Sequence, residues 1–399
     1  MSVAPAQTLL GVPGVGIVYF GNEWFAENRT SSHHIARHLS ASIPVLYVDS
    51  PGMRAPSTSG RDLKRIFKKV VQALQVPSKV SPNLWHCTVP QWPWRRMPGA
   101  GFLNRWFGAW AVRRGMRHVG ITRPVLWFVV PHPSFMINAI DHILAIYYCI
   151  DDYAAHPGVD VDLIKACDAE LTQRADHVFV APPALVQSKQ NVNPATTYSP
   201  HGVDVALFSK ASEAGTVVAP IAAALGSPVI GYFGLIAAWT DLELIEWLAR
   251  ERPQWQFLLI GHPSVDVAKL RTLDNVTLVG PQPYETLPQW AKAFDVAIIP
   301  YKLNQQVRNA NPLKLREYLA TGKPVVSVRT AEVERFSEFV YMADDRNAYL
   351  EAIEQALSSD SPALSARRMG AVRDMSWAHR AQSSLETAAI ALEKRGRHV

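Results

Sequence analysis

Short apolar runs recur along the chain, separated by segments in which apolar residues return every three or four positions. Continuous apolar runs predict buried strands, and the 3.6-residue repeat predicts helices. In the first half, the predicted elements are strands at 16–20, 45–48, 125–130, 145–150 and 177–180, and a helix over 160–174. Alternation of strands and helices predicts a parallel sheet covered on both faces.

The same alternation restarts in the second half. Its predicted elements are strands at 229–233, 257–260, 276–279, 296–299 and 325–328, and helices at 241–250, 287–293 and 312–320. Between them, residues 205–227 are rich in Ala, Gly, Ser and Pro and predict a linker. The fold class is therefore α/β with two doubly wound, Rossmann-like domains. We predict a first domain over 1–204, a second over 228–376, and a helix over 377–399 that packs back on the first.

Composition narrows the class of protein. The chain has 399 residues, too many for one typical core, with 48% hydrophobic and 19% charged residues. No apolar run is long enough for a membrane span and no signal-peptide pattern opens the chain, so we expect a cytoplasmic protein. Its three cysteines have neither metal-binding nor disulfide spacing, and we expect no metal.

The net charge of +6 is unevenly spread. Residues 85–123 contain arginines and aromatics but no acidic residue. Such a segment suits nucleic acid, an anionic membrane surface, or packing of its apolar face into the core. We favour the membrane and expect no nucleic-acid partner, because Phe102, Leu103, Trp106, Phe107 and Trp110 follow helical spacing. The predicted membrane contacts are Trp94, Arg95, Arg96, Phe102, Trp106, Phe107 and Trp110.

The segment 309–324 predicts a loop, a short helix and a turn before the strand 325–328. Asn311 suits the N-cap, Pro312 the first helical position, and Gly322 the end of the helix. The helix start offers unpaired N–H groups and a positive dipole end, which attract an anion such as a diphosphate. Lys314, Glu317 and Tyr318 share one face, so an ammonium for phosphate lies beside a carboxylate for ribose hydroxyls. An ordinary surface Lys/Glu pair is the alternative.

Several polar residues follow predicted strands, where ligands of doubly wound sheets bind. Asp151 and Asp152 are candidate general bases, only one of which is expected to face a ligand; turn capping is their alternative role. His132 is a candidate donor to a sugar hydroxyl or a structural donor. Gly234 permits close approach of a phosphate or closes a tight turn. On the acceptor side, the candidates are Trp24, Arg29 and His33.

Other chemistries lack their motifs. The segment 231–234 has no three spaced glycines for NAD, and no Walker loop, Gly-x-Ser-x-Gly element or His-Glu-x-x-His motif occurs. Hydrolase and NTPase functions therefore have no residue support, and we expect no cofactor beyond a co-substrate.

Segments 201–204, 231–244, 275–287 and 311–326, with 148–153 in the first half, resemble bacterial GT-B glycosyltransferases. The similarity is to family 4-like enzymes of the teichuronic-acid and exopolysaccharide type. It implies the GT-B fold, in which two Rossmann-like domains face each other across a cleft. Glu317 matches the second glutamate of the family's E-x7-E element, which holds the donor ribose, and Asn309 replaces the first.

The family's diphosphate-clamping Arg and Lys are absent after Gly234, so Lys314 with Arg308 would supply that charge. The chain also resembles xanthan-type membrane-associated glucuronosyltransferases, in which an aspartate after a first-domain strand is the base. That likeness favours Asp151 or Asp152 and leaves retention or inversion open.

The resemblance implies a metal-independent, peripheral membrane glycosyltransferase at the cytoplasmic face. It would move a sugar from a nucleotide diphosphate, with UDP as the expected nucleotide, to a lipid-linked saccharide for cell-surface polysaccharide. A nucleotide-sugar epimerase and a non-catalytic sugar-binding partner are the alternatives.

Overall fold

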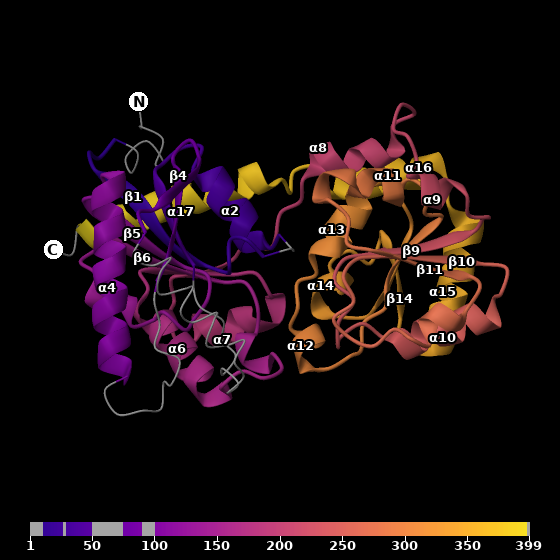
Figure 1. Ribbon diagram of the computed structural model, residues 1–399, viewed down its shortest axis with the longest axis horizontal. Coiled ribbons are helices and arrows are strands. Elements are labelled where there is room, and N and C mark those ends of the chain that lie inside the picture. Colours follow the sequence, from indigo (N-terminus) through magenta and orange to yellow (C-terminus); the bar gives the residue numbers. More distant parts are fainter. Residues whose placement is uncertain (1–10, 27–28, 50–74, 90–99, 397–399) are drawn as a thin grey trace. The chain divides into compact units, whose positions relative to one another are not determined.

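The computed structural model describes residues 11–26, 29–49, 75–89 and 100–396 (Figure 1). The chain divides into two units. We call residues 1–201 with 377–399 the first domain, and residues 202–376 the second domain.

The first domain is built on an eight-stranded sheet with the order β3-β4-β2-β1-β5-β6-β7-β8. Its strands are β1 (Val15–Gly21), β2 (Val45–Asp49), β3 (Ser78–Ser81), β4 (Leu84–Thr88), β5 (Arg123–Phe128), β6 (Leu144–Cys149), β7 (His177–Val180) and β8 (Thr196–Tyr198). All neighbouring strands are parallel except β3 and β4, which form an antiparallel edge. The carboxyl ends of β1, β2, β5 and β6 therefore meet at one edge.

Helices cover both faces of this sheet (Figure 1). They are α2 (Ser31–Leu39), α4 (Ala100–Val119), α5 (Met136–Ala139), α6 (Val161–Arg174), α7 (Val186–Gln190) and α17 (Trp377–Gly396). One core cluster joins alternate residues of the strands to α4, α5 and α6. On the other face, α17 lies beside α2, where the Trp377 and His34 rings stack with centroids 4.8 Å apart. The C-terminal helix is thus part of the first domain, where the sequence pattern places it.

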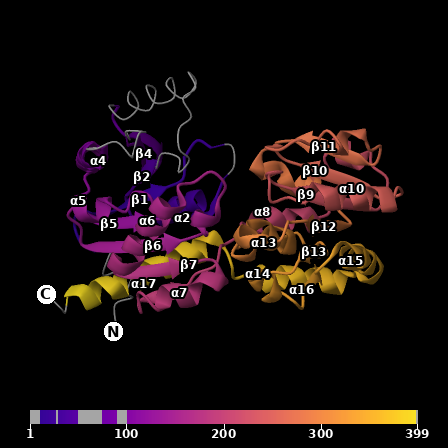
Figure 2. The same ribbon diagram turned by 90° about the horizontal axis from the view of Figure 1, so that it is seen from below.

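The second domain has six parallel strands in the order β11-β10-β9-β12-β13-β14 (Figure 2). They are β9 (Val229–Phe233), β10 (Gln256–Ile260), β11 (Val276–Gly280), β12 (Val296–Ile299), β13 (Val325–Val328) and β14 (Val340–Ala343). The strand order reverses direction between β9 and β12, which is the switch point where doubly wound sheets bind ligands.

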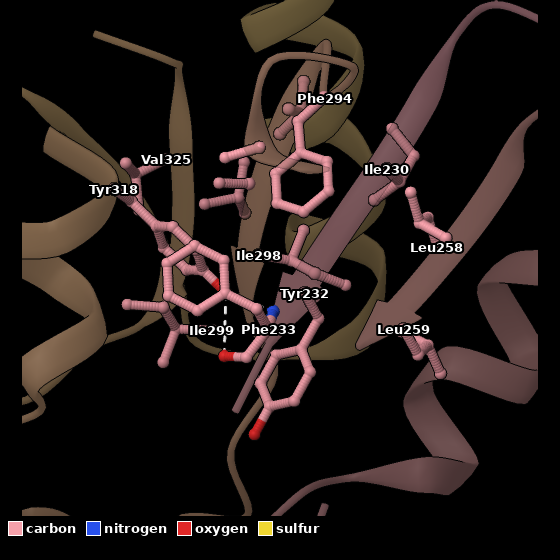
Figure 3. Close-up of a cluster of buried hydrophobic side chains, with 14 of the residues drawn as sticks. Ile230, Tyr232, Phe233, Leu258, Leu259, Phe294, Ile298, Ile299, Tyr318 and Val325 are labelled. Atoms are coloured by element: carbon pink, nitrogen blue, oxygen red, sulfur yellow. Dashed lines mark hydrogen bonds between the residues drawn. The ribbon is translucent and has the colours of Figure 1, made fainter. Parts of the chain in front are cut away.

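The helices of this domain are α8 (Val205–Phe208), α9 (Pro220–Ala223), α10 (Leu242–Glu251), α11 (Leu287–Ala291), α12 (Gln305–Arg308), α13 (Leu313–Ala320), α14 (Ala331–Glu334), α15 (Arg346–Ser359) and α16 (Pro362–Val372). Their apolar faces join the strands in one core, part of which is drawn in Figure 3.

The prediction of two doubly wound α/β domains is confirmed, and four predicted strands, β7, β9, β12 and β13, have the observed bounds. That the domains face each other across a cleft stays a prediction. The predicted linker over 205–227 is wrong. This segment contains α8 and α9, and Phe208, Ala211 and Ala222 are buried in the second-domain core. Other small residues of the segment, such as Ala214, Gly215 and Ala223, are exposed, so a few buried side chains anchor it to the second domain.

None of the described helices combines the length and the apolar character that crossing a membrane requires.

Candidate active site

Two glycines bring strand ends β9 and β10 into close approach. Gly234 (φ 127°) and Gly261 (φ 146°) adopt backbone conformations that other residues rarely accept. A Cβ on Gly261 would lie 1.9 Å from the Gly234 carbonyl oxygen, and a Cβ on Gly234 would lie 2.2 Å from Lys314 Cε. The Lys314 side chain thus lies directly against the Gly234 backbone, at the switch point of the sheet.

Lys314 is surrounded by tyrosines rather than by carboxylates. Its Nζ donates to the Tyr301 hydroxyl at 3.1 Å and lies 5.3 Å and 5.7 Å from the ring centroids of Tyr232 and Tyr301. Burial lowers the pKa of Lys314, but Tyr232, Tyr301 and Glu317 outweigh it, and the net shift is upward. Lys314 therefore remains a cation at neutral pH and is only half-buried, which suits it to an incoming anion.

Glu317 lies one turn further along α13 and is buried. The Tyr284 hydroxyl donates to its Oε1 at 3.2 Å. Burial raises the pKa of Glu317 to about 7, although Lys314 and Tyr284 act in the opposite direction. The side chain can accept a hydrogen bond in either protonation state, and when ionised it is acceptor-only, as binding of a ribose hydroxyl requires.

The start of α13 differs from the prediction by one residue. Pro312, with extended backbone, occupies the N-cap position, and Leu313 is the first helical residue. Asn311 does not cap the helix, because its Oδ1 accepts a hydrogen bond of 2.6 Å from Arg316. Arg316 also pairs with Glu332, and both side chains are almost completely buried. This buried network fixes the loop before α13 to the interior of the domain.

Tyr318 is not placed to contact a donor, contrary to the prediction. It is fully buried; its hydroxyl accepts from the Phe233 N–H at 2.9 Å and donates to the Phe233 carbonyl oxygen at 3.4 Å, the bond that the dashed line in Figure 3 marks. The bond joins α13 to the last residue of β9. Tyr318 therefore positions the Gly234 backbone against Lys314 from inside the core.

The other two donor candidates precede α13. Arg308 ends α12 and is exposed, and the Asn309 N–H bonds the Gln305 carbonyl at 3.1 Å. Asn309 thus belongs to the end of a short helix, and it brings no carboxylate to this side of the site.

In the first domain, Asp151 follows β6 and is paired with a histidine. Its Oδ2 lies 2.8 Å from His156 Nε2, and its Oδ1 accepts from the Asp152 N–H at 2.9 Å. Asp152 is the residue before the short 3-10 turn η1 (Tyr153–Ala155). Sequence reasoning missed His156, because no motif marks a histidine that a single turn brings back to its partner.

The remaining first-domain candidates are mostly structural. His33 Nδ1 accepts from the Thr30 N–H at 3.0 Å, so its Nε2 carries the proton and donates to Glu23 O at 3.0 Å. Both ring nitrogens are thus engaged, Nδ1 in capping α2 and Nε2 at the Glu23 carbonyl, and burial lowers the pKa of His33. Trp24 is buried against Tyr47, which corrects its predicted acceptor contact. His132 is also buried, whereas Arg29 is exposed.

The aromatic residues of α4 divide between surface and core. Phe102, Trp106 and Phe107 have exposed fractions of 71%, 57% and 44%, and Leu103 is also exposed. The buried face carries small or compact residues such as Gly108, Ala109, Val112 and Gly115. Trp110 packs partly against the core. The predicted contacts Trp94, Arg95 and Arg96 lie outside the described residues.

Among the described residues, no group of three or more His, Cys, Asp or Glu side chains could hold a metal ion. The second-domain site offers the Lys314 ammonium, the buried Glu317 side chain as a hydrogen-bond acceptor, and the Gly234 backbone against which Lys314 lies. The site of the first domain offers a carboxylate paired with an imidazole.

Comparison with known proteins gives a consistent picture. Residues 227–359 match a family model described as glycosyl transferases group 1. Over 258 residues, the chain is 27% identical to a Bacillus subtilis protein assigned to teichuronic acid biosynthesis as a glycosyltransferase. That alignment covers 60% of this chain and 64% of the relative.

Solved structures align over nearly the whole chain. Sucrose-phosphate synthase from Thermosynechococcus elongatus matches with a TM-score of 0.64 and 17% identity, covering 96% of this chain and 98% of that one. A trehalose-6-phosphate protein from E. coli, bound with UDP-2-fluoro glucose, matches with a TM-score of 0.65 and 11% identity, covering 93% and 98%. At such identities the likeness establishes the fold.

Proposed function

We propose that this chain, which belongs to the GT-B glycosyltransferases and carries a group 1 domain at residues 227–359, transfers a sugar from a nucleotide diphosphate to a lipid-linked saccharide in cell-surface polysaccharide synthesis. The observation that carries the proposal is Lys314. Its ammonium lies against Gly234 at the switch point of the second-domain sheet, where an anionic ligand would meet a positive charge.

In this proposal, Lys314 binds the donor diphosphate and stabilises it as it leaves, and Arg308 and Asn309, at the end of α12, are further donor-binding candidates. Glu317 accepts a hydrogen bond from a hydroxyl of the donor ribose, which replaces the Tyr284 hydroxyl as the donor to Glu317. We favour a UDP-sugar because a similar structure is described as bound with UDP-2-fluoro glucose. The hexosyl or glucuronosyl class of the sugar is part of the proposal.

The first domain would carry the acceptor, with Asp151 or Asp152 taking the proton of the attacking hydroxyl. We further propose that no metal or cofactor is needed, since the Lys314 cation supplies the charge opposite the leaving group. Transfer measured with and without EDTA tests this: a rate that falls on chelation and returns with Mg²⁺ would contradict it.

The membrane part of the proposal rests on α4. Its exposed residues Phe102, Leu103, Trp106 and Phe107 form an apolar patch, and Arg105 is exposed on the same helix. The helix contains no acidic residue. Aromatics at the headgroup level together with arginines favour an anionic bilayer surface, so we propose that α4 holds the enzyme peripherally to the inner face of the membrane.

Donor binding is tested by thermal shift with UDP-, GDP- and dTDP-sugars, because a ligand that binds only the folded state raises its melting temperature. We expect stabilisation by a UDP-sugar and its loss in Lys314→Met. Lys302→Met is the matched control, since Lys302 lies in the same domain with its Nζ directed to Glu243 at 3.9 Å. Equal shifts in both variants would contradict the role of Lys314.

Transfer is separated from epimerisation by incubating the protein with the donor alone and with lipid extract. A new glycolipid that requires the extract supports transfer. An epimerised nucleotide-sugar without any glycolipid supports the epimerase. Wild-type cell-surface polysaccharide in cells carrying Lys314→Met together with Glu317→Ala would favour a non-catalytic binding partner.

Flotation with vesicles tests the membrane surface. We expect binding to vesicles with anionic lipid, and about tenfold weaker partition for each of Trp106→Ser and Phe107→Ser, given the apolar area removed. Ile221→Ser is the control, because Ile221 is an exposed apolar residue of the second domain. No flotation of the wild type with anionic vesicles would overturn this part.

A further inference from the structure

The second domain contains a cavity of about 340 Å³, and none of the proposed donor-binding residues is among those that line it. We propose that this cavity is a binding site for a neutral sugar unit, separate from the donor site. The inference goes beyond the proposed transfer, because it concerns a second ligand and does not require a bound donor.

The cavity lies at the carboxyl ends of β13 and β14, between the N-terminal parts of α10 and α15. Helix α10 contributes Leu244 and Trp247, the segment after β12 contributes Tyr301 and Leu303, and α15 contributes Tyr349. Tyr349 is buried, and Trp247 and Leu303 are partly buried. Small-molecule sites have volumes of about 300 to 1,000 Å³ and largely apolar, aromatic walls with a few polar groups. The size and the walls of the cavity therefore suit a single sugar ring, whose C–H face is apolar.

Two capping aspartates provide hydrogen-bond acceptors in fixed positions. At the start of α10, Asp241 Oδ1 accepts from the Leu244 N–H at 3.0 Å. At the start of α15, Asp345 Oδ1 accepts from the N–H groups of Asn347 and Ala348, each at 2.9 Å. Both residues line the cavity. These bonds use one oxygen of each carboxylate, and Oδ2 can accept from a hydroxyl of a ligand.

Arg346 adds hydrogen-bond donors to the same lining. Its guanidinium lies 5.0 Å from the centroid of the Trp247 ring, in a cation–π contact that holds it at this wall. A guanidinium only donates hydrogen bonds, and a carboxylate only accepts them. A sugar hydroxyl does both, so one sugar can bond to Arg346 and to the capping aspartates together.

An anionic ligand does not fit this lining. It contains four carboxylates, those of Asp241, Glu243, Asp344 and Asp345, and a single guanidinium. A phosphate or a uronate would meet like charges, which oppose binding. The cavity differs in this respect from the donor site, where Lys314 presents an ammonium.

A cationic ligand gains little, because the same carboxylates already have positive partners. Asp344 Oδ1 pairs with Arg329 at 2.9 Å, and Glu243 lies 3.9 Å from the Lys302 ammonium. The two capping aspartates lie at the positive ends of helix dipoles. The cavity thus offers acceptors and donors without a large unbalanced charge, which is the chemistry of a neutral sugar.

The experiment measures dissociation constants by saturation-transfer NMR with the full-length protein. The neutral probes are the methyl glycosides of glucose, galactose and mannose, together with N-acetylglucosamine; glucuronate and glucosamine are the charged probes. We expect a neutral sugar to bind more tightly than either charged one. Asp241→Asn and Asp345→Asn should each weaken its binding about tenfold, because the amide nitrogen that replaces Oδ2 cannot accept from a hydroxyl.

Matched controls separate binding from folding. Asparagine caps helices as well as aspartate does, so both variants should keep the wild-type melting temperature. Asp160→Asn makes the same change at the cap of α6, outside the cavity, and should bind the sugar as the wild type does. Three outcomes would overturn the inference: binding of no neutral probe, equal affinity in the wild type and both cavity variants, or a charged probe that binds at least as tightly as the neutral ones.

Failure of the proposed function has a different signature. Lys314→Met should lose stabilisation by the donor and keep the wild-type affinity for the neutral sugar. If the proposed function fails, no nucleotide-sugar stabilises the protein and none is used for transfer, whereas sugar binding and its dependence on Asp241 remain. If the inference alone fails, the donor stabilises the wild type and transfer proceeds, whereas no sugar affinity depends on Asp241 or Asp345.

Discussion

The first domain contains two Asp–His pairs with the same separation of 2.8 Å and different surroundings. The Asp49–His86 pair is sealed inside, and Asp49 Oδ1 accepts the Trp24 N–H at 2.7 Å. The Asp151–His156 pair is open to solvent. Distance alone therefore does not mark a catalytic pair. The solvent exposure of the carboxylate and its other hydrogen-bond partners decide whether it can react with a ligand or only stabilises the fold.

The second domain repeats this contrast on a single helix. Arg316 is buried in α13 with Glu332 and Asn311, whereas Lys314, two positions earlier, is half-buried against Gly234. Successive helical positions point in different directions, so one cation is directed to the core and the other to the strand ends. Substitutions at sealed charges should change stability, and substitutions at open charges should change transfer.

The largest expected stability effect is at Arg316. Arg316→Met removes the cation facing the buried Glu332, and we expect a loss of about 3 to 5 kcal/mol in the free energy of unfolding. Chemical denaturation measures it. Arg316→Met combined with Glu332→Leu should recover most of the loss, since no buried charge then remains. If the double variant is no more stable than the single one, the buried charge is not the cause.

Glu317 should make the free energy of unfolding depend on pH, by about 3 kcal/mol at most. Burial raises its pKa from 4.5 to about 7, so the folded protein holds the proton to higher pH than the unfolded chain. Its stabilising contribution is full below pH 4.5 and is lost as the pH rises to about 7. Relative to Glu317→Gln, the wild type should lose stability across this window. Parallel curves for the two proteins from pH 4.5 to 8 would contradict the burial effect.

The smallest effect is expected at the sealed pair. Asp49→Ala leaves the buried Trp24 N–H without its acceptor, and we expect a loss of about 1 to 3 kcal/mol in unfolding free energy. Transfer activity per folded molecule should stay the same. A fall in kcat at full folding would place Asp49 in the active site and remove the contrast between the two pairs.

Much of the fold follows from the sequence, for a physical reason. Strands of a sheet covered on both faces are continuously apolar, so runs such as 177–180 and 296–299 are found with their bounds. The short edge strand β8 and the antiparallel β3 have no such run and were missed. The supposed linker failed because small residues are common both in exposed segments and in tight packing.

The candidate site was only partly predictable. Lys314 and Glu317 follow from the helix pattern and the family resemblance. The burial of Tyr318 and the pairing of Asn311 with Arg316 do not, because a helix pattern gives the face of a residue but not the element that packs on it. For the same reason, the sequence did not indicate that His156 pairs with Asp151.

The sequence by itself determined the two α/β domains, the helix that precedes the strand 325–328 and the placement of Asp151 after a strand. These follow from local periodicity and from the direction that parallel strands impose on their ends. Only the tertiary structure decided which charges are sealed and which are open. Burial depends on neighbours distant along the chain, such as Glu332 for Arg316 and Gly234 for Lys314, and no local pattern specifies them.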